Sequence, residues 1–400
     1  MRSILISGAG IAGPTLAYWL LEQGITPTLV EKAPHLRTSG YVIDFWGLGY
    51  KVADKMRLLS TLDREGYDVS ELRLVNGEGQ RVGGFDAGVF RNLTGGRYLS
   101  IARSELAKLL CEKIKDRCEV IFGDEVTAID DQGDGVRVGF RHAREGRFDA
   151  VIGADGLHSE VRELVFGPEK RFEISLGYMV ATFQARGYRP RDELVYVSYA
   201  IPGRQVARFA MRGDRTMFLF VFAADEPSGV GAHDMAAQKA LLNATFRDAG
   251  WECPQILAAL DKSDDLNFDR VSQIHMDAWS KGRVALVGDA AFCVSLLAGQ
   301  GSALAMGAAY ALAGELGRAD AGSPAAFQRY EALLRPLIAT KQKAALQFAS
   351  GFAPKTRWGL FVRNQVTKAM ALPFVAKLAM GSSLLDRIDL PDYAWGAEPS

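Results

Sequence analysis

The chain has few cysteines and histidines, and their spacing argues against two common kinds of site. Cys111, Cys118, Cys253 and Cys293 lie scattered, and no two of them form a CxxC pair. The five histidines include no HxxxH pair. A disulfide framework is therefore not expected, and neither is a metal site.

The sequence also lacks an excess of one charge. Lys+Arg 47 balance Asp+Glu 47, so the formal net charge is zero. Because nucleic-acid-binding proteins are usually strongly basic, we expect no nucleic-acid partner.

Long apolar runs are missing as well. No segment offers ~18 uninterrupted apolar residues, so no integral membrane segment is expected. The apolar stretch from Ile4 to Leu21 is interrupted by three glycines, which argues against a signal peptide. With no export signal and few cysteines, the expected location is the cytoplasm.

What the sequence has is a mononucleotide-binding pattern at its start. The 400 residues are enough for two or three domains. Ser3–Ser7 is typical of a strand, residues 11–23 of a helix, and residues 27–31 of a second strand. Between the first strand and the helix lies a GxGxxG motif, Gly8-Ala9-Gly10-Ile11-Ala12-Gly13. Its glycines allow a tight turn, approach of a pyrophosphate and close helix–strand packing, while the helix N-terminus attracts phosphate.

Glu31 ends the second strand, and Lys32 follows it. A carboxylate at this position can accept hydrogen bonds from the ribose of an adenosine. It favours an ADP moiety without a 2′-phosphate, so the pattern predicts FAD or NAD. The motif alone does not separate these two cofactors.

The rest of the chain predicts a second, mainly β region and a helical end. Residues 42–62 are expected to be mostly helical, and Ser100 is an expected N-terminal signal for a helix over residues 103–115. Strand runs at residues 178–185, 194–200, 206–211 and 216–222, separated by turn signals, predict an antiparallel meander. From residue 325 the pattern is helical, with expected breaks at Pro336, Pro354 and Pro373.

Two later motifs add specificity. Gly153-Ala154-Asp155-Gly156-Leu157-His158-Ser159-Glu160-Val161-Arg162 is typical of a strand end, a turn and a helix that Ser159 could cap. Gly282-Arg283-Val284-Ala285-Leu286-Val287-Gly288-Asp289-Ala290-Ala291 is typical of a buried strand that ends at an aspartate. Leu297-Ala298-Gly299-Gln300-Gly301 then opens another helix, whose N–H groups can face developing negative charge.

Together, the three ordered motifs resemble the group A flavoprotein monooxygenases, the FAD-dependent aromatic hydroxylases of the p-hydroxybenzoate hydroxylase type. The resemblance covers about residues 3–340. It implies that Asp155 and Gly156 lie near the FAD pyrophosphate, and that Gly288 and Asp289 hold the ribityl chain. It also places Ala298, Gly299 and Gly301 beside the flavin ring, and Arg103 near the FAD phosphates or ribityl chain. Arg37 and Asp44 resemble flavin-site positions in the tetracycline-inactivating branch.

The resemblance implies a fold and a domain order. We expect an α/β protein with a Rossmann-like FAD-binding domain, an inserted antiparallel-sheet substrate domain and C-terminal helices. The expected FAD-binding segments are residues 1–75, 98–172 and 273–330. The expected substrate segments are residues 76–97 and 173–272, and residues 331–400 are expected to bridge the two domains.

The resemblance also implies an activity. Relatives use NADPH or NADH and O2, through a flavin C4a-hydroperoxide, to hydroxylate or epoxidise a small aromatic or polycyclic substrate. Since the flavin carries the chemistry, no catalytic side chain is assigned. A flavin reductase or oxidase on the same fold remains an alternative, as does a flavin-loaded ligand-binding protein without turnover.

Two departures from the family pattern concern the substrate side. Phe292 stands where relatives often have a histidine, and Leu296 stands where they have a proline that borders flavin and substrate. The alternating strands suggest that some apolar side chains line an aromatic pocket. The residues predicted to line it are Phe183, Met211, Phe220, Phe222 and Leu296.

The C-terminal segment has a charge pattern of its own. Between Glu331 and Asp386 there is no acidic residue but there are eight basic ones, Arg335, Lys341, Lys343, Lys355, Arg357, Arg363, Lys368 and Lys377. Three interpretations stay open: a brace between domains with a solvated basic face, a rim that attracts anionic ligands, or weak membrane contact by a basic amphipathic segment.

Overall fold

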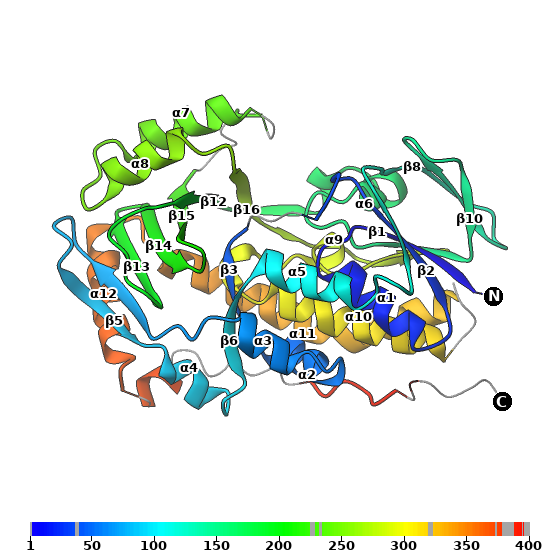
Figure 1. Cartoon of the computed structure of the whole chain (residues 1–400). Coiled ribbons are helices and arrows are strands. Elements are labelled where there is room, and N and C mark those ends of the chain that lie inside the picture. The colour runs from blue at the N-terminus through cyan, green and yellow to red at the C-terminus, as the bar shows by residue number, and fades with distance from the viewer. Residues whose placement is uncertain are drawn as a thin grey trace.

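The computed structural model describes residues 2–36, 40–224, 229–231, 234–318, 323–372, 374–377, 388–393 and 395. Two large sheets form two lobes, and long helices run beneath both of them (Figure 1). The predicted α/β class, with a Rossmann-like parallel sheet and a second sheet, is confirmed.

The first lobe is built on a six-stranded sheet in the order β17-β18-β11-β1-β2-β7. All of its pairings are parallel except the one between β17 and β18. Its strands are β1 (Ser3–Ser7), β2 (Thr26–Glu31), β7 (Glu119–Phe122), β11 (Ala150–Gly153), β17 (Ser280–Lys281) and β18 (Val284–Leu286).

Helices and a small sheet cover this parallel sheet. Figure 1 shows α1 (Ala12–Leu21), α5 (Arg103–Glu112) and α10 (Gly301–Gly317) gathered on one side. On the other side lie α6 (Glu160–Phe166) and a three-stranded sheet of β8 (Val126–Asp131), β9 (Val136–Phe140) and β10 (Gly146–Phe148). Short parallel strands buried on both faces explain why β1 and β11 are almost wholly apolar.

The second lobe is a seven-stranded sheet in the order β16-β12-β15-β14-β13-β4-β5. Its strands are β4 (Glu71–Val75), β5 (Arg81–Asp86), β12 (Glu173–Arg186), β13 (Val195–Ile201), β14 (Arg204–Met211), β15 (Arg215–Ala223) and β16 (Leu266–Ile274). The expected meander is correct for β13, β14 and β15 only, because β12 pairs with β15 and not with its sequence neighbour. The strand β4 pairs in parallel with β13, although the expected boundary at residue 75 assigned it to the FAD-binding segments.

Two helices, α7 (Met235–Phe246) and α8 (Cys253–Asp261), cover one face of the seven-stranded sheet. The aromatic rings of Phe183, Phe218, Phe220 and Phe222 pack there in one buried cluster with Leu242 and Phe246. The opposite face turns toward the first lobe.

A two-stranded ribbon, β3 (Val42–Trp46) and β6 (Tyr98–Ala102), links the lobes. The expectation that residues 42–62 are mostly helical is therefore wrong for residues 42–46. Helix begins only with α2 (Gly47–Lys55), and α3 (Leu59–Glu65) follows. The expected helix signal at Ser100 is also wrong. Ser100 lies inside β6, where its hydroxyl donates a hydrogen bond to Asp44 at 2.6 Å.

The remaining short elements are α4 (Gly88–Leu93), η1 (Glu169–Arg171), α9 (Asp289–Phe292) and η2 (Leu296–Ala298). The chain then enters α11 (Pro324–Phe352), which packs along α10, and α12 (Arg357–Ala369), which packs on β5 and β13. Helix α11 continues through Pro336, so the expected break there is wrong, whereas Pro354 does separate α11 from α12. Pro373 lies outside the described residues. No helix among the described residues is long and apolar enough to cross a membrane.

Candidate functional site

A cleft of about 400 Å³ opens between the two lobes. One wall comes from turns at the carboxyl ends of β1, β2, β11 and β18, where ligands of open α/β sheets bind. The other wall includes Val180 and Thr182 of β12 and Asp269 and Arg270 of β16. The cleft therefore joins the GxGxxG turn to the face of the seven-stranded sheet that turns away from α7 and α8.

The GxGxxG turn has the geometry its spacing predicts. Gly8 has φ +107°, and a Cβ there would come within 2.5 Å of the carbonyl oxygen of Ala154. A Cβ at Gly13 would overlap the carbonyl oxygen of Gly8, so α1 lies directly against the turn. Gly10 faces the cleft instead, and the first atom its Cβ would meet is Nη2 of Arg103 at 3.7 Å. The first and third glycines thus permit the fold, and the second leaves room for a ligand.

Glu31 holds this turn from the end of β2. Its carboxylate accepts hydrogen bonds from the backbone N–H of Ala9 at 2.8 Å and of Ala33 at 2.9 Å. Both Glu31 and Lys32 line the cleft. The acid is therefore placed beside the N-terminus of α1, where an adenosine ribose could reach it.

The β11–α6 turn carries Asp155 and Gly156 into the cleft. Ser159 caps α6 by accepting a hydrogen bond from the N–H of Arg162 at 3.0 Å, which confirms the predicted cap. Asp155 accepts hydrogen bonds from the Ser159 hydroxyl and the N–H of Val161. Burial raises the pKa of Asp155, and these hydrogen bonds oppose the shift. Its carboxylate is consequently part of the turn itself.

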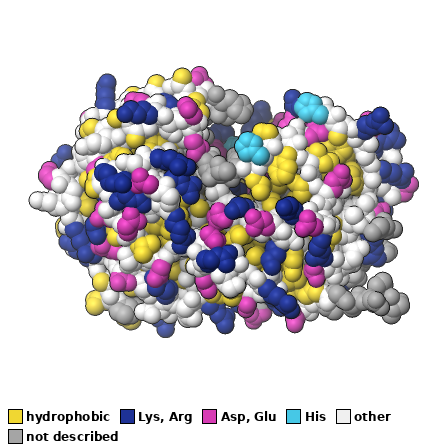
Figure 2. Space-filling view, in the orientation of Figure 1, with side chains coloured by type: hydrophobic (Ala, Val, Ile, Leu, Met, Phe, Trp, Pro, Cys, Tyr) yellow, Lys and Arg dark blue, Asp and Glu magenta, His cyan; other side chains and the backbone are white. Residues whose placement is uncertain are grey.

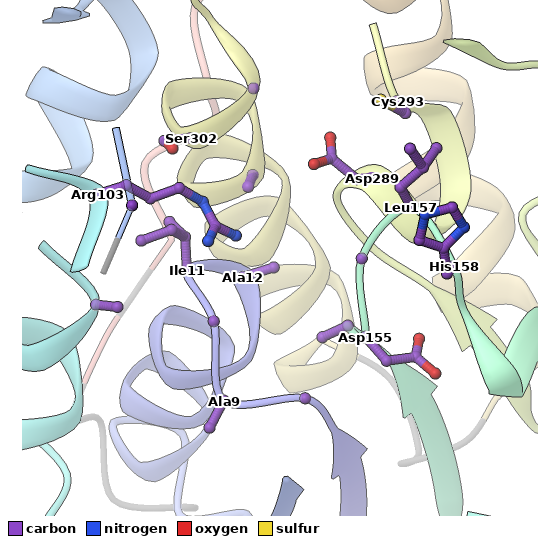
Figure 3. Close-up of a pocket in the computed structure, with 18 of the residues that line it drawn as sticks. Ala9, Ile11, Ala12, Arg103, Asp155, Leu157, His158, Asp289, Cys293 and Ser302 are labelled. Atoms are coloured by element: carbon purple, nitrogen blue, oxygen red, sulfur yellow. The ribbon is translucent and has the colours of Figure 1, made fainter. Parts of the chain in front are cut away.

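Arg103 and Asp289 point into the cleft from opposite sides (Figure 3). Arg103 begins α5, and Asp289 follows β18 at the start of α9. Burial raises the pKa of Asp289, while the positive charge of Arg103 lowers it. The pair offers one acceptor and one cation across an open space, which suits the hydroxyls and phosphates of a dinucleotide.

The η2–α10 loop closes the cleft near Asp289. Gly299 adopts the left-handed conformation at φ +65°, and Gly301 begins the 17-residue helix α10. Leu296, Gly299 and Gly301 line the cleft, so the positive end of the α10 dipole faces it. Burial raises the pKa of the Cys293 thiol well above its usual value, so this cleft-lining cysteine stays a neutral thiol.

The structure gathers most of the predicted cofactor residues in this cleft. Those lining it are Gly8, Gly10, Ile11, Ala12, Glu31, Lys32, Arg103, Asp155, Gly156, Asp289, Gly299 and Gly301. Gly13 and Gly288 lie behind the lining, where Gly288 packs against Ala12. Ala298 belongs to the η2 turn but is not a lining residue.

Asp44 is not among the residues that line this cleft. It lies on β3 and accepts hydrogen bonds at 2.6 Å from the hydroxyls of Tyr98 and Ser100. Desolvation by the surrounding protein raises the pKa of Asp44, and its hydrogen bonds with Ser100 and Tyr98 oppose this shift. Arg37, the other residue matched to the tetracycline-inactivating branch, lies outside the described residues.

The predicted substrate residues divide between the two faces of the second sheet. Leu296 lines the cleft. Phe183, Phe220 and Phe222 do not, because the alternation of side chains points them at α7 and α8, and their prediction as pocket residues is corrected. Met211 lies on the cleft side of the sheet, in a cluster with Tyr67, Phe209 and Met217, but it is not a lining residue.

His158 and Asp269, which the sequence analysis did not propose as site residues, form a contact between the two walls of the cleft. His158 of the β11–α6 turn lies 3.1 Å from Asp269 of β16 and 3.1 Å from Glu169. Hydrogen bonds to these two carboxylates raise the pKa of His158 to about 10. His158 stands inside a recognised motif, but its partner on β16 has no signal in the sequence. Only the packing of the two lobes pairs them.

Comparison with known proteins places this architecture in a family. Residues 1–341 match the family model described as FAD binding domain. A flavin-dependent monooxygenase from an unknown prokaryotic organism is 33% identical over 392 residues, covering 98% of each chain. A flavin-dependent monooxygenase of Legionella longbeachae is 33% identical over 408 residues, again covering 98% of each chain. The crystal structure of tetracycline destructase Tet(51) is similar with a TM-score of 0.83 and 30% identity, covering 98% of this chain and 99% of that one.

The chain therefore belongs to the FAD-binding flavin-dependent monooxygenases of group A. Its cofactor is FAD, and the residues of the cleft fit that cofactor. The glycine at position 8 permits the tight turn before α1. The N-termini of α1 and α10 face the cleft, and the side chains of Arg103 and Asp289 project into it.

Proposed function

We propose that this protein uses NAD(P)H and O2 to insert one oxygen atom into a small aromatic or polycyclic substrate. NAD(P)H supplies two electrons, one oxygen atom enters the substrate, and the other leaves as water. The chemistry that FAD supplies when bound is hydride acceptance and activation of O2 as the C4a-hydroperoxide. The remaining tasks fall to the residues of the cleft.

One observation carries the proposal. The cleft that contains the dinucleotide fingerprint continues without interruption to Thr182 and Asp269 on the second sheet and to Leu296 beside it. A flavin ring near the η2–α10 loop would therefore face a wall that belongs to the other lobe. Such a shared space between cofactor and sheet lets the protein orient a second molecule and exclude water.

Each wall has a distinct role in this proposal. Glu31 and the N–H groups at the start of α1 bind the ADP moiety, and Arg103 and Asp289 bind the rest of the chain toward the ring. The N-terminus of α10 stabilises negative charge that develops on the reduced flavin. Leu296 and Thr182 contact the substrate. The likeness to a tetracycline destructase supports a polycyclic substrate class.

The test starts with the purified, FAD-loaded protein under anaerobic conditions. We expect NADPH or NADH to bleach the flavin spectrum, and O2 to restore it through a transient peroxide-type absorption band. With a panel of phenols and polycyclic compounds including tetracyclines, labelled O2 should deliver one labelled atom to the product. Consumption of NAD(P)H without label in any product would instead indicate a reductase or oxidase. Flavin that NAD(P)H reduces neither alone nor with any compound of the panel would indicate a binding protein.

A further inference from the structure

An exposed apolar stripe runs along α12, and two further exposed apolar side chains follow the end of the helix. Trp358, Phe361, Val362 and Val366 follow one another at helical spacing, and their exposed fractions are 72%, 52%, 41% and 44%. Leu372 and Phe374, just after the helix, are 62% and 76% exposed. These six side chains are called the α12 stripe below.

The stripe is not the face by which α12 packs on the protein. On the opposite side, Arg363 donates a hydrogen bond to Oε1 of Gln205 on β14 at 3.0 Å. Thr367 and Met370 are buried, and Met370 packs against Phe85 of β5. Thr356 caps the helix by accepting a hydrogen bond from the N–H of Gly359 at 3.0 Å. The helix is thus anchored by one face and leaves an aromatic face uncovered.

The charged residues of the segment that carries the stripe have one sign. Lys355, Arg357, Lys368 and Lys377 are exposed next to it, and no acidic residue occurs between Glu331 and Asp386. On the face of the molecule that Figure 2 shows, by contrast, positive Lys and Arg side chains are interspersed with negative Asp and Glu side chains. A chain of zero net charge therefore has only positive charges in the segment that carries these exposed aromatic side chains.

We propose that the α12 stripe docks on an anionic lipid surface. A helix that lies in a membrane interface combines an apolar face containing Trp and Phe with Lys and Arg along its flank, as α12 does. Trp358 and Phe361, whose rings stack at 5.5 Å, enter the region of the headgroups. The four flanking cations remain at the level of the lipid phosphates.

The inference does not depend on the proposed reaction, because docking needs neither substrate nor turnover. Docking would fix the position of the protein relative to the membrane. Helix α12 lies on the same sheet whose cleft-facing side forms the second wall of the site, so docking would bring that lobe next to the lipid phase. An apolar substrate dissolved in lipid would then be held near the protein.

The test measures binding of the FAD-loaded full chain to vesicles. We expect co-sedimentation with vesicles of phosphatidylcholine and phosphatidylglycerol, little with phosphatidylcholine alone, and loss of binding at high salt. Binding should be accompanied by a blue shift of tryptophan emission. The Trp358→Phe variant should keep binding and lose most of that shift.

Substitutions separate the stripe from other exposed apolar residues. The double variant Trp358→Ser/Phe361→Ser should bind anionic vesicles on the order of tenfold more weakly or worse, since both anchors are lost. Lys368→Glu should weaken binding about fivefold or more. Val362→Ser, at 41% exposure, should weaken it, whereas Leu164→Ser on α6, at 40% exposure, should not. The flavin spectrum of every variant checks that the fold is intact.

Three results would overturn the proposal. The first is equal binding to neutral and anionic vesicles, and the second is binding that the double variant leaves unchanged. The third is absence of vesicle binding, with a concentration-dependent dimer that the double variant abolishes. That result would make the α12 stripe an interface between two copies of this chain.

Discussion

The two walls of the cleft are built in different ways. The wall from the first lobe is mainly backbone: the turn at Gly8, the N-termini of α1 and α10, and a few charged side chains. The wall from the second lobe is made of side chains on β12 and β16, such as Thr182 and Asp269. A wall made of backbone can be predicted from the spacing of glycines in the sequence. The residues of a wall made of side chains can be predicted only when it is known which face of each strand is turned toward the cleft.

The largest effect is expected at Gly13. Gly13→Ala would force a Cβ into the carbonyl oxygen of Gly8, so α1 could not pack against the turn. The matched variant Gly10→Ala places its Cβ in the cleft, 3.7 Å from Arg103, without a backbone clash. We expect Gly13→Ala to yield little folded protein, and Gly10→Ala to fold with weakened FAD binding. Circular dichroism and flavin content measure both, and normal FAD binding by Gly13→Ala would contradict the assigned geometry.

The next effect distinguishes the two faces of the second sheet. Phe220 is fully buried against Phe246 of α7, so Phe220→Ala should lower the free energy of unfolding by about 3–5 kcal/mol. Leu296 lines the cleft. Leu296→Ala should therefore change the KM for substrate and the fraction of NAD(P)H use that yields product, and it should lower the free energy of unfolding less than Phe220→Ala does. Denaturant titration and steady-state kinetics test the pair. A substrate-specific defect in Phe220→Ala at full stability would restore the prediction that Phe220 lines the pocket.

A third comparison concerns Asp289 and Asp44, two of the three aspartates that the family resemblance assigned to FAD. Asp289→Asn removes a charge inside the cleft, and loss of a charged hydrogen bond worth about 1.5–3 kcal/mol should weaken FAD binding roughly tenfold or more. Asp44→Asn keeps an acceptor for Tyr98 and Ser100 and should weaken FAD binding less. Titration of the apoprotein with FAD gives both constants. An equal or larger loss for Asp44→Asn would show that Asp44 also holds the cofactor.

The smallest effect should come from His158, which joins the two walls. Its pKa is raised in the folded protein to about 10, mainly by Asp269 and Glu169. The ion pairs therefore stabilise the fold fully below the unfolded pKa of about 6.5, and this stabilisation is lost as the pH rises toward 10. Because the side chain is half exposed, the contribution should stay at about 1 kcal/mol or less.

The measurement is the difference in melting temperature between the wild type and His158→Gln across this pH range. The difference should shrink as the pH rises. A difference that is constant with pH would mean that His158 stabilises by packing alone. His275→Gln serves as a control, because burial lowers the pKa of His275 and it has no carboxylate partner among the described side chains.

Local patterns predicted the local parts of this molecule. The GxGxxG turn, the acid at the end of β2, the cap at Ser159 and the aspartate after β18 all depend on residues a few positions apart. Their geometry follows from steric limits on glycine and from unpaired N–H groups at helix ends, which act wherever the segment lies. The family resemblance that rests on these motifs was confirmed for the same reason.

Other expectations failed where distant segments meet. Ser100 was expected to be the N-terminal signal for the helix over residues 103–115. Helix α5 does begin at Arg103, but pairing of β6 with β3 turned the Ser100 hydroxyl toward Asp44. Pro336 was expected to end a helix, but α11 continues through it along α10. In both places, pairing or packing with another segment overruled the role that local sequence gave to the residue.

The sequence by itself determined the cofactor, the class of fold and most of the residues with which the first lobe lines the cleft. Only the tertiary structure decided which face of β12 and β15 looks toward α7 and which toward the cleft, because both faces of these strands are apolar. It also decided that His158 meets Asp269, and that α12 keeps an aromatic stripe uncovered. Those features are set by how whole elements pack. Helical spacing groups the apolar side chains of α12 on one face, but only packing decides that this face stays exposed.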